Sequence, residues 1–272
     1  MARRGRPLTG TTPTAARRFF ERRYRAAGSP ARAAGAKAYL KSELRFYGTS
    51  MPEIRRAAND FAREHPELTR AELRKIVDEL WSTDVFELRS AGVALLSKYA
   101  ELLTERDITW LLGFVRRSKT WAHVDWLAAD VIGGVVGESR PALRRLPAWA
   151  RDENFWVRRT ALLTQLRALS HEAGDFPLFA RLAAPMLRER EFFIRKAVGW
   201  VLREVSKKRP DLTFVFLREH RDEVSGLTLG EGAKYLPARQ RRQLGLSPKA
   251  AWIDRERRRK ASASDRRGRP GS

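Results

Sequence analysis

Apolar residues recur every three to four positions through almost the whole chain between Thr12 and Tyr235, the spacing of one face of an α-helix. Stretches in which β-branched and polar residues alternate, as they do in strands, are scarce. Proline and glycine interrupt the helical pattern, so we predict about a dozen helices of roughly 10–18 residues joined by short loops. The interruptions lie at Gly28–Pro30, Gly48–Pro52, Pro66, Pro141, Gly174 and Pro210.

Several residues are of the types whose side chains cap the first backbone amides of a helix. Thr69 and Glu72 have the spacing of a capping box. Thr104, Ser118 and Asp211 are predicted to begin other helices. Together with the apolar spacing, these residues predict an all-α protein.

Three segments of the chain share one residue pattern: Phe86–Ala91, Phe155–Thr160 and Phe192–Ala197. Their starts lie 69 and 37 residues apart, and Thr120 falls midway in the longer gap. Such a period of roughly 35 residues is typical of helical solenoids. We therefore predict a superhelical solenoid of HEAT-like antiparallel helix pairs, in one domain of residues 12–253 with a concave face.

Basic residues recur at fixed positions of this repeat. Arg89, Arg158 and Arg195 share one position, and Arg159 and Lys196 share the next. If the repeated helices line the concave face, these cations would give it a positive groove. The alternative is that they are solvated residues with glutamate partners.

The net charge of +23 results from 55 Lys and Arg against 32 Asp and Glu. Residues 1–11 and 254–272 are rich in Arg, Gly, Ser and Lys and poor in apolar residues, so we predict disordered basic arms there. The remaining chain is basic as well. This charge predicts a polyanionic partner, most simply nucleic acid, whose phosphates the arms would bind in a salt-dependent manner. A ribosomal or membrane-surface role also fits the charge alone.

Composition excludes several classes of site. There is no cysteine, which rules out disulfides, cysteine-ligated zinc and iron–sulfur clusters. The four histidines are far apart, so we predict no histidine-rich metal site. No apolar run is long enough to span a bilayer, and no apolar segment follows the basic start to make a signal peptide. We therefore expect a cytoplasmic protein without metal.

Trp121 and Asp125 are the strongest candidates for chemistry. Asp125 stands where the other copies have Ala91, Thr160 and Ala197, if the copies are aligned on Thr120. It follows Trp121 by one helical turn, so the two side chains share a face. An aromatic ring beside a carboxylate suits a cationic substrate group. Alternatively, Trp121 is a packing residue and Asp125 pairs with a neighbouring arginine. We predict that His123, between them, is a surface residue.

Three stretches resemble the DNA alkylation repair glycosylases of the AlkD-like group. They are Ser118–Asp125, Asn154–Ala161 followed by Gln165-Leu166, and Glu191–Glu204. A fainter match joins Tyr39–Lys41 to Pro52–Arg56. The resemblance extends over roughly residues 13–235, with the segments in the same order and at similar spacing.

The resemblance implies HEAT-like repeats that cup duplex DNA. It implies hydrolysis of the N-glycosidic bond of cationic N3- or N7-alkylpurines, without metal or other cofactor. It assigns the catalytic positions to Trp121, Asp125 and Trp200, with DNA contacts from Arg159 and, to a lesser degree, Tyr39. We expect further DNA contacts from Arg55, in the fainter match, and from the repeat cations Arg158, Arg195 and Lys196.

Two departures from the family pattern flank the key tryptophan. The family often has a second tryptophan where this chain has Thr120, and an aspartate where it has Ala122. The prediction is thus a monomeric, nucleoid-associated glycosylase whose partner is duplex DNA with alkylated bases. The alternative is a HEAT-like protein that binds bent, branched or damaged DNA without catalysis. An RNA- or ribosome-associated protein is a third reading, which depends on charge alone.

Overall fold

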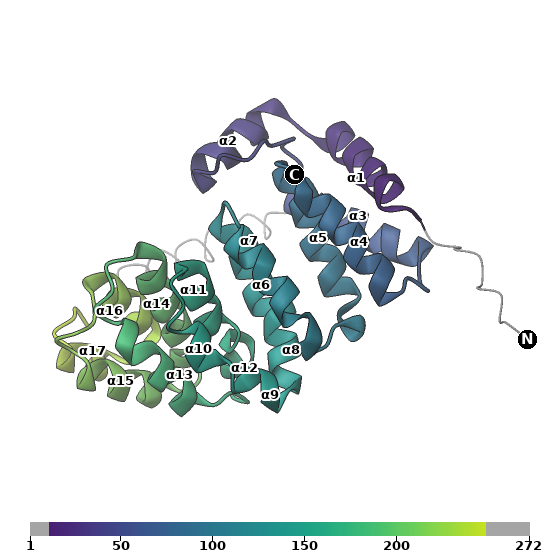
Figure 1. The fold of residues 1–272 in the computed structure, drawn as a ribbon. Coiled ribbons are helices and arrows are strands. Elements are labelled where there is room, and N and C mark those ends of the chain that lie inside the picture. The colour runs from purple at the N-terminus through teal and green to yellow at the C-terminus, as the bar shows by residue number, and fades with distance from the viewer. Residues whose placement is uncertain (1–10, 249–272) are drawn as a thin grey trace, which may run out of the picture. The chain divides into compact units, whose positions relative to one another are not determined.

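The computed structural model describes residues 11–248, in which helices joined by loops are accompanied by one isolated bridge, between Arg45 and Val85, as the only β-type pairing. The all-α helical-repeat prediction is confirmed (Figure 1). The two predicted basic arms lie almost entirely outside the described residues. No helix among residues 11–248 combines the length and the apolarity that crossing a bilayer requires.

The chain divides into two compact units between Arg167 and Ala168. The helices of the first unit are α1 (Pro13–Ala27), α2 (Pro30–Leu40), α3 (Met51–Glu64), α4 (Arg70–Ser82), α5 (Phe86–Lys98), α6 (Ile108–Arg116), α7 (Trp121–Trp126), α8 (Gly133–Glu138), α9 (Arg140–Leu143), α10 (Leu146–Trp149) and α11 (Phe155–Leu163). A short helix, α12 (Leu166–Ser170), contains the division. The helices of the second unit are α13 (Phe176–Ala183), α14 (Phe192–Ser206), α15 (Pro210–Glu219), α16 (Gly226–Gly232) and α17 (Ala238–Gln243).

Single turns of 3₁₀-helix supplement these elements at Ala100–Leu102, Glu105–Asp107, Ala184–Met186 and Ala233–Tyr235. Several helices are shorter than predicted, because turns interrupt the long apolar stretch between Gly133 and Ser170. In the first unit α5 packs against α3, α4 and α7, and α7 packs in turn against α11. Helices α3, α5, α7 and α11 are therefore successive neighbours in one layer, which we call the repeat layer (Figure 1).

The capping predictions were partly right. Thr69 and Glu72 form the predicted capping box, and Thr104 caps a 3₁₀ turn. Ser118 is not a cap, because its buried hydroxyl donates to the carbonyl of Phe114 in the preceding helix. Asp211 lies within the first turn of α15, where its charge favours the helix dipole but does not cap the helix.

Helix boundaries shift the predicted repeat alignment by one residue at α7. Phe86, Phe155 and Phe192 are the first residues of α5, α11 and α14, whereas Thr120 precedes its helix and accepts a hydrogen bond from the Ala122 amide at 3.3 Å. Trp121 is therefore the counterpart of those phenylalanines. Asp125 then matches the polar residues Ser90, Arg159 and Lys196. Trp126 matches the buried Ala91, Thr160 and Ala197, so the alignment that placed Asp125 in this small-residue row is wrong.

A π-helical segment, Leu127–Ile132, follows Trp126 directly and leads into α8. π-Helix is rare, and inside α-helices it occurs frequently at functional sites because the wider turn redirects the side chains around it. Gly133 ends the segment where the chain approaches α11 closely. A Cβ atom there would lie 2.9 Å from the Thr164 carbonyl oxygen, so only glycine fits without a shift.

Helix α2 differs from its neighbours because none of its residues is buried. It is held at its base, where Gly28 and Gly48 leave no room for a side chain: a Cβ on Gly28 would meet the Tyr47 carbonyl oxygen at 2.3 Å. The buried carboxylate of Glu87 fixes this base by accepting hydrogen bonds from the amides of residues 47–49 at 3.0, 2.7 and 3.2 Å. The position of α2 is thus set at its ends rather than along its length.

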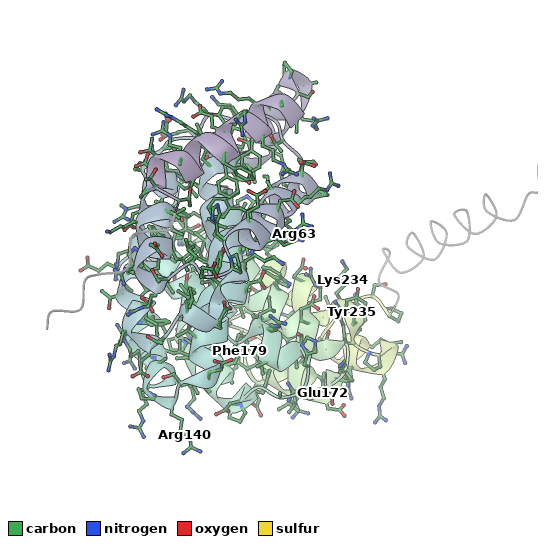
Figure 2. All side chains as sticks on the ribbon, turned by 90° about the vertical axis from the view of Figure 1, so that its right-hand side faces the viewer. Arg63, Arg140, Glu172, Phe179, Lys234 and Tyr235 are labelled. Atoms are coloured by element: carbon green, nitrogen blue, oxygen red, sulfur yellow. The ribbon has the colours of Figure 1, made fainter. Side chains whose placement is uncertain are left out.

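In the second unit, α14 packs against α15 and closely against α16. Gly199 permits the approach of α16, since a Cβ there would lie 2.8 Å from Cβ of Glu231. The core includes Phe179, which is fully buried, whereas Glu172 projects into solvent (Figure 2).

Candidate functional site

Asp125 and Arg159 form a bidentate ion pair between α7 and α11. Nε of Arg159 donates to Oδ1 of Asp125 at 2.7 Å, and Nη2 donates to Oδ2 at 2.9 Å. The two residues occupy the same position of adjacent repeats, which explains why they face each other. This geometry fixes the plane and the orientation of the carboxylate. The sequence hypothesis that Asp125 pairs with a neighbouring arginine is confirmed.

The pair is largely withdrawn from solvent. The Arg159 side chain is 4% exposed and that of Asp125 is 13% exposed. Burial raises the pKa of the Asp125 carboxyl above its ordinary value, while the hydrogen bonds and the charge of Arg159 oppose that rise. Arg159 therefore favours the ionised carboxylate at a place where burial alone would disfavour it.

Trp121 lies half-buried at the start of α7 and contacts Tyr39 of α2 edge to face, with the ring centroids 5.7 Å apart. Tyr39 is 72% exposed, which is exceptional for a large aromatic side chain. The loop after α2 also ties down the start of α7, because the Ser42 hydroxyl donates to the Lys119 carbonyl at 3.0 Å. Tyr39, Trp121, Asp125 and Arg159 thus belong to one part of the first unit.

His123 is buried beneath α7, so the prediction that it is a surface residue was wrong. Its ring stacks on Phe86 with centroids 4.6 Å apart, and Nε2 lies 2.9 Å from the Ser90 hydroxyl. Burial lowers the pKa of His123 to about 3, so the ring is neutral. In the corrected alignment His123 matches the buried Leu88, Val157 and Ile194. It therefore occupies a packing position and fastens α7 to α5.

The repeat arginines have one contact in common. Nε of Arg89 donates to the Thr83 carbonyl, Nη1 of Arg158 to that of Asp152, and Nε of Arg195 to that of Glu189, each at 2.7 Å. In each case the acceptor lies six residues before the arginine. These arginines thus tether the loop that leads into their helix. For Arg158 and Arg195 a DNA contact stays a prediction beside this observed structural role.

Arg55 of α3 is exposed and lies over the ring of Trp126, with Cζ 5.3 Å from the centroid. The cation therefore sits on the side of α7 that faces α3. Asp125 is on the side that faces α11. Two adjacent residues of the chain, Asp125 and Trp126, thus contact side chains of different neighbouring helices.

Trp200 lies on α14 in the second unit, half-buried beside a different set of charges. Glu231 of α16 accepts a hydrogen bond from Nζ of Lys196 at 3.0 Å and forms an ion pair with Arg203. Both cations share α14 with Trp200, Lys196 one turn before it. Sequence reasoning missed Glu231, because no residue near it in the sequence signals its pairing with another helix.

Among residues 11–248, no cluster of three or more histidine, aspartate or glutamate side chains could hold a metal ion.

A protein-family model described as "DNA alkylation repair enzyme" matches residues 20–236. The chain belongs to the DNA alkylation repair enzyme family. Its place in that family implies a role in the repair of alkylated DNA, and the match extends across both units.

Two solved structures are similar to this chain. A predicted DNA alkylation repair enzyme from Enterococcus faecalis is 26% identical, covering 77% of this chain and 96% of the other, with a TM-score of 0.70. AlkD2 from Streptococcus mutans is 19% identical over 69% of this chain and 90% of its own, with a TM-score of 0.55. At this low identity, the similarity to AlkD2 shows a shared fold and nothing more. No curated protein matches the chain significantly.

Proposed function

We propose that this protein is a DNA glycosylase that hydrolyses the N-glycosidic bond of cationic N3- or N7-alkylpurines in duplex DNA. The observation that carries the proposal is the Asp125 carboxylate, which is mostly buried, held by Arg159 in a fixed orientation, and one turn from Trp121. Family membership adds the substrate class, alkylated DNA. Such an enzyme would act on the chromosome and therefore be found with the nucleoid.

The chemistry of the reaction suits a carboxylate without a strong acid. Alkylation at N3 or N7 makes the purine a cationic leaving group, so protonation of the base is not needed. Bond cleavage transfers positive charge to the deoxyribose. A carboxylate at that place stabilises the developing charge, and in a site of low dielectric the effect is far larger than in water. Asp125 would also orient the attacking water.

Arg159 supports this role by holding the carboxylate rather than by titrating. It occupies one acceptor direction of each oxygen and leaves the other lone pairs for the sugar or the water. It also opposes the rise that burial causes in the pKa of Asp125. That Arg159 contacts a DNA phosphate stays a sequence-based expectation beside this bond.

The aromatic residues are proposed to bind the nucleotide. Trp121 and Tyr39 meet edge to face and leave the Tyr39 ring largely exposed, as expected for residues that contact a sugar and backbone. We extend the proposal to Trp200 on the strength of the resemblance and of its half-buried position. Neither function nor geometry requires a metal ion.

The alternative is a family member that binds DNA without catalysis. A pure binder has no need of a carboxylate held beside its aromatic contacts, because no positive charge develops there without a reaction. This argument favours the enzyme.

The decisive experiment is incubation of the full chain with duplex DNA that contains 7-methylguanine, followed by chromatographic detection of the free base. Release by the wild type and not by Asp125→Asn is expected. Binding of the methylated duplex without release would support the alternative. Preferential binding of RNA over duplex DNA would overturn both.

A further inference from the structure

A cleft of about 360 Å³ lies in the repeat layer, lined by α3, α5 and the residues that follow Asp125. Helix α3 contributes Arg55 and Asn59 to its lining, α5 contributes Ser97 and Lys98, and the α7 region contributes Trp126 and Asp130. The volume is comparable with that of small ligand sites in proteins. The lining is polar and charged except for one tryptophan and two alanines.

Trp126 breaks the repeat pattern at this cleft. Its counterparts Ala91, Thr160 and Ala197 are small and fully buried. An indole cannot fit that volume without overpacking the core, and the π-helical segment begins at the next residue. The side chain is instead half-exposed and forms a wall of the cleft. Trp126 therefore lines a surface cleft instead of packing in the core.

The cations of the cleft are not neutralised by the protein. On α3, Arg56 pairs with Glu53 and Arg63 pairs with Asp60. Arg55 and Lys98, by contrast, form no ion pair within residues 11–248. With Asp130 as the one acid in the lining, the cleft has a net charge of +1, and Arg55 lies over the Trp126 ring.

We propose that this cleft binds the sugar–phosphate backbone of the duplex, next to the nucleotide at Asp125. A phosphodiester needs cationic N–H donors, which Arg55 and Lys98 supply. The deoxyribose needs an apolar wall, which Trp126 supplies. Because Trp126 directly follows Asp125, a strand that runs along the layer would occupy both places. The proposal rests on the DNA-binding part of the proposed function and not on catalysis.

The absence of cysteine from the chain makes site-specific crosslinking decisive. The variant Ser97→Cys places a lone thiol in the cleft. Ser82→Cys on α4 is the matched control, since both hydroxyls donate to a carbonyl of their own helix and Ser82 is the more exposed. Each is mixed with an undamaged duplex that has a thiol tether on one backbone phosphate. A disulfide crosslink with Ser97→Cys alone is expected; equal crosslinking, or crosslinking at Ser82 only, would overturn the proposal.

Salt titrations give a second, independent measurement on unmodified duplex. Arg55→Gln should lower the slope of log binding constant against log salt by about 0.9, the value for one lost phosphate contact. Arg56→Gln, whose arginine is already paired, should leave the slope unchanged. Asp130→Asn should tighten binding, because it removes the only negative charge in the cleft. Unchanged binding in all three variants would refute the cleft assignment.

The outcomes also separate the two proposals. A Ser97 crosslink in a protein that releases no base would leave the cleft assignment standing and overturn the glycosylase. Base release without the crosslink and without the change in slope would support the glycosylase and overturn the cleft assignment. A chain that does not bind duplex DNA at all would overturn both.

Discussion

Each unit pairs a carboxylate with cations across two helices, one of which carries a tryptophan, but the number of paired cations differs. In the first unit Asp125 is matched by Arg159 alone, so the pair is neutral and almost enclosed. In the second unit Glu231 is shared by Lys196 and Arg203, and Arg203 also pairs with Glu204, so the charges form a network in which the cations are more exposed than Arg159. The first arrangement can stabilise a cation that forms during a reaction. In the second the cations are partly exposed, which suits the phosphate contacts of the proposed function. We therefore expect similar residues to serve different tasks in the two units.

Neutralising Asp125 and Glu231 in two single variants should distinguish an effect on catalysis from an effect on DNA binding. Asp125→Asn is expected to lower the rate of base release by roughly 100- to 1,000-fold, because it removes charge stabilisation of the developing sugar cation. DNA affinity should be equal or slightly higher. Glu231→Gln is expected to raise DNA affinity and to alter release only a few-fold. Single-turnover release assays and binding titrations measure both, and equal loss of release would show that the comparison is mistaken.

Removing Arg159 from its ion pair with Asp125 should destabilise the fold. Arg159→Ala leaves the buried Asp125 without a partner, which is expected to cost about 3–5 kcal/mol in the free energy of unfolding. Arg70→Ala is the control: its partner Asp107 is also buried but retains Arg74, so the loss should be much smaller. Urea unfolding monitored by circular dichroism compares them.

Replacing Arg159 by glutamine should also move the pH dependence of catalysis. Base release requires the ionised Asp125, so it should fall as pH drops through the pKa of that carboxyl, which burial has raised. Because Arg159 opposes the rise, the acid limb of the rate profile should shift to higher pH when Arg159 is replaced by glutamine. An unshifted limb would mean that another group controls it.

The close approach of α16 to α14 at Gly199 can be tested by adding one methyl group. Gly199→Ala introduces a Cβ only 2.8 Å from that of Glu231, which should push α16 away from α14. We expect a loss of about 1–3 kcal/mol in unfolding free energy and weaker DNA binding. Gly134→Ala is a suitable control, since a Cβ there meets nothing within 4 Å. Equal effects would show that the approach of α16 is not constrained at Gly199.

His123, which is buried beneath α7, should affect mainly the pH dependence of the free energy of unfolding. The pKa of His123 is lowered to about 3 from an ordinary 6.5, so below pH 6.5 the unfolded chain binds a proton that the native state does not. Stability should therefore fall as pH decreases in this window, by up to about 1.4 kcal/mol per pH unit from this residue. His123→Leu, which restores the aliphatic residue of the other repeats, should reduce that slope. A slope identical to the wild type would argue against a neutral buried ring.

The sequence predicts most of the fold because local signals determine it. Apolar spacing fixes the helices, and the Thr69–Glu72 spacing fixes a cap. The repeat alignment failed by one residue, because Thr120 resembles the first residue of a helix in spacing but caps it in space. Because of that error, the alignment did not show that Trp126 replaces a small buried residue of the repeat. It also did not show that Asp125 and Arg159 occupy the same repeat position. His123 and Glu231 were misjudged or missed because their surroundings depend on contacts between helices distant in sequence.

Helix α2 has a consequence for how the molecule opens. Its hydrogen bonds receive no support from buried side chains, only from five alanines and from the anchored base at Gly28 and Gly48. Its amides should therefore exchange with deuterated solvent well before those of α5, in which nearly every residue is buried. Trypsin should first cut the described chain after Lys37 or Lys41. The element that carries Tyr39 is thus the least costly part of the first unit to unfold.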